Sequence, residues 1–262
     1  MHAVFPHMHV LGKRYALSVT PPEGGEDTCV VEGDYDFDNH VAANLASWNA
    51  ETNSVDGGKW AEVAKRRMTF LAEVEQEPNM PLTHVAMEFQ ARGPAFNCLT
   101  ACAASTQAIG EATEILRRGD ADVMITGGAH TMIHPFGVSG FNRLTALSTR
   151  NDSPQTASRP FSYDRDGFVL GEGGGILIVE TLEHAKARNA PILAEILGYG
   201  STADAYRITD IHPDGLGAQK AMAAALRHAG IDPKSPGPDG RAPVQYVSAH
   251  GTGTPENDGI ET

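Results

Sequence analysis

Short apolar runs alternate with amphipathic stretches between residues 95 and 249, and this alternation most constrains the fold. The first amphipathic stretch, residues 104–119, predicts a helix that ends at Gly119. Its apolar side chains recur at helical spacing: Ile109, Ala112, Ile115 and Leu116. Apolar runs precede and follow it at residues 95–100 and 121–128. The second run is continuous, which is typical of strands covered on both faces, so the order predicts a β-α-β unit.

The same alternation continues toward the C-terminus. Further elements are expected at residues 173–182 (strand), 182–188 (helix), 190–200 (strand), 215–230 (helix) and 244–249 (strand). Strands and helices that alternate in this way build a layered α/β domain.

The first forty or so residues differ in character from the rest. Residues 14–20 alternate as a strand does, residues 21–28 form a turn cluster, and residues 29–39 predict a second strand that runs into acidic residues. The stretch 48–77 predicts a helix that ends before Pro78. We therefore expect a boundary near residue 50.

Composition excludes several classes of function. The net charge of -13, with scattered Lys and Arg, argues against a nucleic-acid or membrane surface. Three cysteines, Cys29, Cys98 and Cys102, do not form a disulfide framework in a chain this long, which favours a reducing compartment such as the cytoplasm. No apolar run approaches the roughly 20 residues that span a bilayer, and residues 1–10 lack the pattern of a signal peptide.

Cys102 is the first candidate for chemistry. It lies in "TACAAS", residues 100–105, at the start of the predicted helix. Small neighbours let a ligand approach the backbone, and free N–H groups at a helix start favour the thiolate and could hold a developing oxyanion. The alternative is that Cys102, like Cys98, is a small buried core residue, since free cysteine is among the most buried residue types. The residues alone leave both interpretations open.

His250 is the second candidate. It follows the predicted strand 244–249, and ligands of open α/β sheets bind at the carboxyl edge of the strands. A histidine there could act as an acid or a hydrogen-bond donor, and the hydroxyls of Thr252 and Thr254 could bind an amide-containing ligand. The alternative is a loop histidine whose ring is satisfied by the backbone.

Taken together, "TACAAS" and "AHGTGTPENDGIET" resemble the β-ketoacyl synthases of the thiolase-like superfamily, most closely the 3-oxoacyl-acyl-carrier-protein synthase II type. Further stretches follow the family's order along the chain: "EQEPNMPLTHVAMEFQARGP" before the first motif, and "GDADVMITGGAH", "ALSTRNDSPQTASRPFSYDRDGFVLGEGGGILIVE" and "GYGSTADAYRITDIHPDG" between the two. The resemblance covers roughly residues 52–262. It implies a thiolase-like layered α-β-α-β-α fold, truncated at both ends.

Three parts are expected on this basis. Residues 1–50 are a strand-rich segment whose origin the sequence does not assign, residues 51–196 are most of the family's N-terminal half, and residues 197–262 open its C-terminal half.

The resemblance also implies a two-stage reaction. Cys102 would accept an acyl chain from acyl carrier protein as a thioester, and the carbanion formed when malonyl-carrier protein loses CO₂ would attack it. His250 matches the first of the family's two catalytic histidines, and Thr252 and Thr254 would bind substrate. Implied partners are acyl carrier protein and a second ketosynthase chain in a homodimer or heterodimer, and no cofactor is expected.

The family's supporting lysine, second histidine and glycine-rich oxyanion loop would lie beyond Thr262. Acylation of Cys102 is therefore expected to survive better than condensation in these 262 residues. The alternative to a working synthase is a catalytically incomplete fragment or a non-catalytic partner subunit. Cys102 argues against the latter, because such partners usually lack the cysteine.

The N-terminal segment has a motif of its own. His7 and His9 stand two apart, so in a strand both would face one side and could share a metal ion. The segment resembles the copper-binding HxH strand of ascorbate-dependent type II copper monooxygenases over fewer than forty residues. A lone HxH is more often a pair of strand histidines.

Overall fold

The computed structural model describes residues 4–8, 14–19, 28–34, 48–49, 54–67, 74–75, 77–133, 135–208, 210–237 and 239–262. The chain divides into two compact units, each of which is described by itself. Residues 1–136 and 172–191 make up the first unit, and residues 137–171 and 192–262 make up the second.

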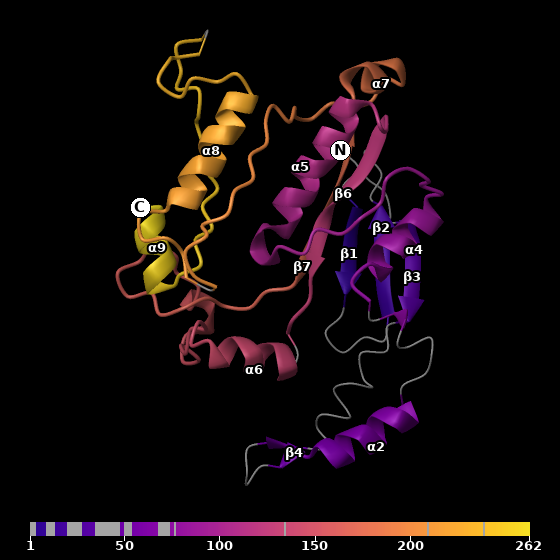
Figure 1. Ribbon diagram of the computed structural model, residues 1–262, viewed down its shortest axis with the longest axis vertical. Helices are drawn as coiled ribbons and strands as arrows, with labels where there is room; N and C mark the ends of the chain where they lie inside the picture. Colours follow the sequence, from indigo (N-terminus) through magenta and orange to yellow (C-terminus); the bar gives the residue numbers. More distant parts are fainter. Residues whose placement is uncertain are drawn as a thin grey trace. The chain divides into compact units, whose positions relative to one another are not determined.

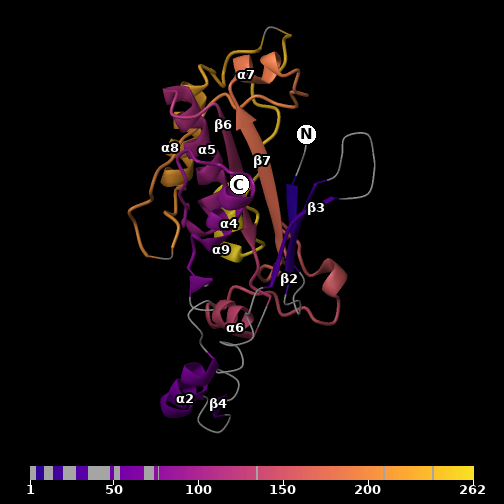
Figure 2. The ribbon, with the colours of Figure 1, turned by 90° about the vertical axis from the view of Figure 1, so that its right-hand side faces the viewer.

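The first unit is built on a five-stranded sheet in the order β3-β2-β1-β7-β6. All neighbouring strands are antiparallel. The strands are β1 (Val4–Met8), β2 (Arg14–Val19), β3 (Thr28–Asp34), β6 (Val123–His130) and β7 (Gly173–Glu180). The three N-terminal strands form a meander that extends the sheet beside β7 (Figures 1 and 2). The strands predicted at residues 14–20 and 29–39 correspond to β2 and to the shorter β3.

Helix α5 (Ala104–Arg118) packs along β6 and β7 and supplies most of the buried apolar residues (Figures 1 and 2). Ala112, Ile115 and Leu116 are at most 7% exposed, on the face that the sequence predicted. The predicted stop is also confirmed, because Gly119 ends the helix in the left-handed conformation with φ +77°.

Strand β6 differs from expectation in its burial. We expected residues 121–128 to be covered on both faces, but Thr126 is the one buried residue of β6. The reason is its pairing: β6 runs antiparallel to β7 along its whole length, from Val123 opposite Glu180 to His130 opposite Gly173. Antiparallel sheets commonly bury only one face.

Further elements of the first unit are short. They are β4 (Trp48–Asn49), β5 (Ser54–Val55), α2 (Gly57–Arg67), α4 (Met80–Glu88), the 3₁₀ turn η1 (Ala101–Ala103) and α7 (Leu182–Ala187). The helix predicted between residues 48 and 77 is thus α2, which ends at Arg67. None of the helices among the described residues combines the length and apolarity needed to cross a bilayer.

Most of helix α6 (Pro135–Arg143) belongs to the second unit, which also contains η2 (Pro154–Thr156), α8 (Leu216–His228) and α9 (Pro255–Glu261). The segment before α8 passes very close to that helix at two glycines. A Cβ atom added at Gly198 or Gly200 would come within 2.2 Å of the backbone oxygen of Ala225 or Ala221. Side chains at these two positions would therefore push the segment away from α8.

Three predicted strands are not strands in the structure. Residues 95–100, 190–200 and 244–249 are all described, and none of them belongs to a strand. A strand needs the backbone of a neighbouring strand as hydrogen-bond partner along its length, and none of the strand pairs among the described residues includes these segments. Large apolar side chains in them are correspondingly exposed, such as Leu99 at 73% and Tyr246 at 82%.

Candidate functional site

Cys102 lies in the η1 turn directly before α5 and is exposed to solvent. Ala101 before it has φ +50°, in the left-handed region that residues with a Cβ rarely adopt. The backbone thus turns sharply just before the thiol and then enters a helix of 15 residues. Such a turn is a strained conformation that surrounding structure must hold in place.

The start of α5 is held against β6 by a close contact. A Cβ atom added at Gly128 would lie 2.0 Å from the Ser105 hydroxyl oxygen and 3.1 Å from its Cβ. Only glycine at this position allows the first turn of α5 to approach the strand so closely. Gly128 therefore sets how far the turn carrying Cys102 stands from the sheet.

Cys98 has a different environment from Cys102. It is partly buried, and burial, followed by the nearby carboxylate of Glu111, raises the pKa of its thiol. A raised pKa leaves less thiolate at neutral pH, and the thiolate is the nucleophile. Of these two cysteines, Cys102 is the one that is open to an incoming acyl group.

His250 stands on a loop of the second unit whose backbone is bound by a carboxylate. The N–H groups of His250 and Gly251 donate to the two oxygens of Glu261, at 2.7 and 2.8 Å. The side-chain amide of Asn257 donates to the same carboxylate at 2.9 Å. Burial raises the pKa of Glu261, but these hydrogen bonds outweigh it and the pKa is lowered. The carboxylate therefore stays ionised at neutral pH and keeps both N–H groups engaged.

Asp258 supports the same loop from inside. It is 1% exposed, and it accepts hydrogen bonds from the N–H of Phe161 at 2.6 Å and of Gly253 at 3.1 Å. Burial raises its pKa, but the hydrogen bonds and Arg165 outweigh this and lower it. A buried carboxylate paired in this way is costly to remove or to neutralise.

Thr252 and Thr254 bind each other. Their hydroxyl oxygens lie 2.8 Å apart, and the Thr254 oxygen also accepts from the N–H of Asn257 as the N-cap of α9. Both residues are partly buried. Their role in substrate binding stays a prediction. The Thr254 hydroxyl already has a structural role, because it caps helix α9.

The structure brings His250, Thr252 and Thr254 together on one loop, whereas Cys102 belongs to the other unit. Sequence reasoning missed the residues that hold this loop, Asp258 and Glu261. A signal was present, because two acidic residues three apart after Thr254-Pro255 lie on one face of a short helix. They could have been assigned to the loop, but only a folded backbone shows which N–H groups they bind.

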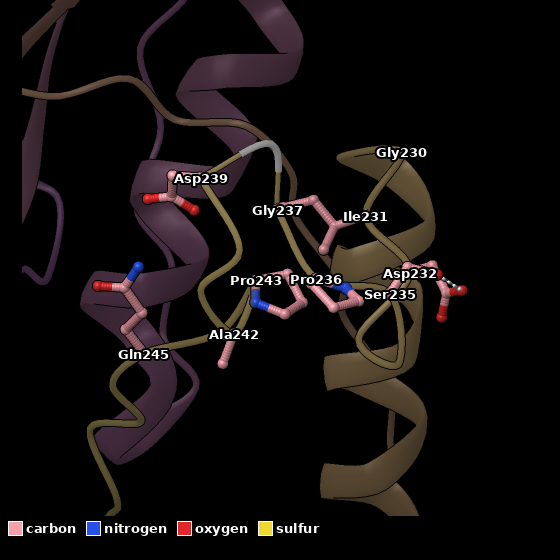
Figure 3. Close-up of a pocket in the computed structure, with 10 residues that line it drawn as sticks. All are labelled: Gly230, Ile231, Asp232, Ser235, Pro236, Gly237, Asp239, Ala242, Pro243 and Gln245. Atoms are coloured by element: carbon pink, nitrogen blue, oxygen red, sulfur yellow. Dashed lines mark hydrogen bonds between the residues drawn. The ribbon is translucent and has the colours of Figure 1, made fainter.

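The predicted metal pair lies outside what is described. His7 is in β1, of which the structure describes the backbone alone, and His9 is outside the described residues. Among described side chains, no three His, Cys, Asp or Glu residues come together as metal ligands would. A surface hollow of about 500 Å³ is lined by ten residues between Gly230 and Gln245, and it includes none of the predicted site residues (Figure 3).

Two sequence profiles match the chain. The profile of the β-ketoacyl synthase N-terminal domain matches residues 34–185, and that of the C-terminal domain matches residues 193–262. The chain is 43% identical over 235 residues to the 3-oxoacyl-[acyl-carrier-protein] synthase 2 of Staphylococcus aureus strain N315, covering 87% of this chain and 55% of that protein. It is 48% identical over 184 residues to the mitochondrial 3-oxoacyl-[acyl-carrier-protein] synthase of Arabidopsis thaliana, covering 70% of this chain and 38% of that protein.

Solved structures agree. A type II polyketide ketosynthase, solved with its acyl carrier protein and bound to the hexaketide, matches with a TM-score of 0.71 and 35% identity over 84% of this chain and 50% of that chain. A β-ketoacyl synthase from Burkholderia phymatum matches with a TM-score of 0.69 and 35% identity over 78% of this chain and 48% of that chain. The chain thus has part of the thiolase-like fold and spans about half the length of the relatives it matches. With a family profile over residues 34–185, the chain belongs to the β-ketoacyl synthase family.

Proposed function

We propose that this chain takes part in the decarboxylative condensation of an acyl thioester with malonyl-acyl carrier protein, in fatty acid or polyketide synthesis. The observation that carries the proposal is the position of Cys102, exposed in a strained turn at the start of a long helix. The names of its relatives support the class of reaction.

In the first stage, the Cys102 thiolate attacks the thioester carbonyl of an acylated carrier protein. In this proposal, a backbone N–H of the turn that carries Cys102 holds the oxyanion that forms. The N–H groups of Ala103 and Ala104 already donate to the carbonyls of Thr100 and Ala101. When the tetrahedral intermediate collapses, the bond to the carrier's sulfur breaks, that sulfur takes a proton, and the acyl chain stays on Cys102. Covalent catalysis in this way divides one difficult step into two.

In the second stage, His250 acts on the malonyl thioester. A hydrogen bond from its ring to the thioester carbonyl stabilises the enolate left when the carboxylate departs as CO₂. Thr252 and Thr254 offer hydroxyls to the amides of the carrier's prosthetic arm. The enolate carbon then attacks the acyl carbonyl on Cys102, the new carbon–carbon bond forms, and the Cys102 thiolate leaves.

The proposal extends to partners and place. Acyl carrier protein would deliver both substrates, and a second ketosynthase chain would complete a homodimer or heterodimer. One solved relative was seen with its acyl carrier protein, and another with its chain length factor. Residues 1–50 would be a separate segment, 51–196 would belong to the N-terminal half and 197–262 to the C-terminal half. The odd number of cysteines supports the cytoplasm as the compartment of this chain. The scattered Lys and Arg residues argue against nucleic acid as a ligand.

The test is transfer of an acyl group to a defined sulfur. The chain is incubated with an acylated carrier protein, and peptides are mapped by mass spectrometry. We expect the acyl mass on Cys102, its loss in Cys102→Ser, and its retention in the matched control Cys98→Ser. Acyl transfer that persists in Cys102→Ser, or none in the parent chain, would contradict the proposed function.

A further inference from the structure

The loop that carries His250 is fastened to a second loop, residues 159–167, far away in sequence. The N–H of Gly167 donates to the carbonyl of Gly253 at 3.0 Å. The N–H of Phe161 donates to the carboxylate of Asp258 at 2.6 Å. We call residues 250–254 the histidine loop. Its position in the second unit thus depends on contacts that the 159–167 loop makes.

Arg165 makes most of the side-chain contacts between the two loops. Its Nε donates to the carbonyl of Thr254 at 3.1 Å, and one terminal nitrogen donates to the carbonyl of Pro255 at 3.0 Å. The other terminal nitrogen donates to Ser162 in its own loop, also at 3.0 Å. The Arg165 side chain is 19% exposed; its bonds to Thr254 and Ser162 are partly buried, and the bond to Pro255 is exposed.

The positive charge of Arg165 is paired with the negative charge of Asp258. Its Nε lies 3.5 Å from a carboxylate oxygen of the fully buried Asp258, which in turn accepts from the N–H of Gly253. One guanidinium therefore binds Thr254 at the end of the histidine loop directly and, through Asp258, the neighbouring Gly253. Three donors in one rigid plane can serve three acceptors at once, which the single ammonium of a lysine does not reproduce.

We propose that Arg165 is a positioning residue for His250. The inference rests on the proposed role of His250 in decarboxylation. His250 follows a segment that belongs to no strand among the described residues, and on that side its backbone is held by the carboxylate of Glu261. Arg165 holds the chain on the C-terminal side of His250, where it contacts Thr254, Pro255 and Asp258. Reacting groups misplaced by about 1 Å lose rate by roughly 100-fold, so a residue that sets the loop position also sets the rate.

The matched control is Arg159, an arginine of the same loop. It bonds to Thr156 and pairs with Asp164 at 2.5 Å, and it makes neither of the carbonyl contacts of Arg165. The variants are Arg165→Ala, Arg165→Lys and Arg159→Ala in the full 262-residue chain.

The first readout needs no activity. Amide hydrogen exchange is followed at residues 250–253 and, for comparison, in α8. We expect Arg165→Ala to speed exchange at residues 250–253 by about tenfold, as loss of one or two hydrogen bonds would, with α8 unchanged. Arg159→Ala should leave both regions unchanged. The role of Arg165 would be overturned if Arg165→Ala and Arg159→Ala changed the exchange rate equally, or if Arg165→Ala changed it equally at residues 250–253 and in α8. It would also be overturned if Arg165→Ala left the exchange rate unchanged.

The second readout is decarboxylation of malonyl-acyl carrier protein. Arg165→Ala should lower kcat by roughly 100-fold with KM unchanged, and Arg165→Lys should recover only part of it. Added methylguanidinium should restore rate to Arg165→Ala and not to Arg159→Ala, which a merely structural loss would not show. An unchanged kcat, a change confined to KM, or no rescue would overturn the inference. Equal decarboxylation by the parent chain and His250→Ala would instead overturn the role of His250, and exchange would still decide whether Arg165 holds the loop.

Discussion

At the scale of single residues, the two cysteines before α5 differ in accessibility. Cys102 is exposed, whereas Cys98 is partly buried and its pKa is raised. We expect iodoacetamide near neutral pH to label Cys102 at least about tenfold faster than Cys98, because rate follows the exposed thiolate. Brief labelling followed by peptide mapping measures this. Similar rates at the two cysteines would contradict the assignment of Cys102 as nucleophile.

Asp258 provides a second prediction at this scale. Asp258→Asn replaces one acceptor oxygen by a donor that faces the N–H of Phe161 or Gly253. One buried donor is then left without a partner, so the free energy of unfolding should fall by about 2 kcal/mol. Urea denaturation measures the loss. Asp239→Asn, on an exposed side chain that accepts from the N–H of Arg241, is the control and should change little. An equal loss in both variants would refute this account.

At the scale of secondary-structure elements, a pair of glycines tests how closely α5 packs on the sheet. Gly128→Ala places a Cβ 2.0 Å from the Ser105 hydroxyl and should push the start of α5 outward. We expect a stability loss of about 2 kcal/mol, as in overpacked cores, and slower acylation of Cys102. Gly175 pairs with Gly128 across the ladder, and a Cβ there meets nothing within 4 Å. Gly175→Ala is therefore the control, and a similar loss there would show that the contact with α5 is not responsible.

The junction of β7 and α7 predicts a pH dependence. Hydrogen bonds from Arg188, and also from His184, outweigh burial and lower the pKa of Glu180 to about 2. Because the folded-state pKa lies below the ordinary value, the stabilisation is complete above about pH 5 and is lost as pH falls toward 2.

Glu180→Gln removes the charge at every pH. The parent chain should therefore be more stable than this variant at pH 7, and the difference should vanish near the lowered pKa of about 2. Thermal unfolding across this pH range measures it. A difference that is constant with pH would disprove the assignment.

At the scale of the whole molecule, residues 95–100 belong to no strand among the described residues, and Phe96 and Leu99 are 49% and 73% exposed. Exposed apolar side chains on a segment with a strand-like sequence favour pairing with another chain. We expect the chain to self-associate at high concentration and Leu99→Lys to weaken this. Light scattering with increasing concentration measures it. A monodisperse monomer at every concentration would contradict the prediction.

The sequence by itself determined the elements that depend on local patterns. Helix 104–119 was predictable because its apolar spacing and its glycine stop act within one segment, and the strand that follows it is likewise a local run. The order of motifs was enough to indicate the family. Cys102 and His250 could be singled out because their neighbours, small residues in one case and glycines and threonines in the other, are adjacent in the chain.

Tertiary structure decided everything that needs a partner from elsewhere. Segments 95–100, 190–200 and 244–249 have strand-like sequences, but a strand exists only where another backbone accepts its hydrogen bonds, and pattern alone does not show that. Likewise, Arg165 and Asp258 stand 93 residues apart (258 − 165), and their pairing appears only once two loops meet. Which backbone groups Arg165, Asp258 and Glu261 bind around His250 therefore appears only in the fold, because these hydrogen bonds are made to backbone groups that carry no residue identity.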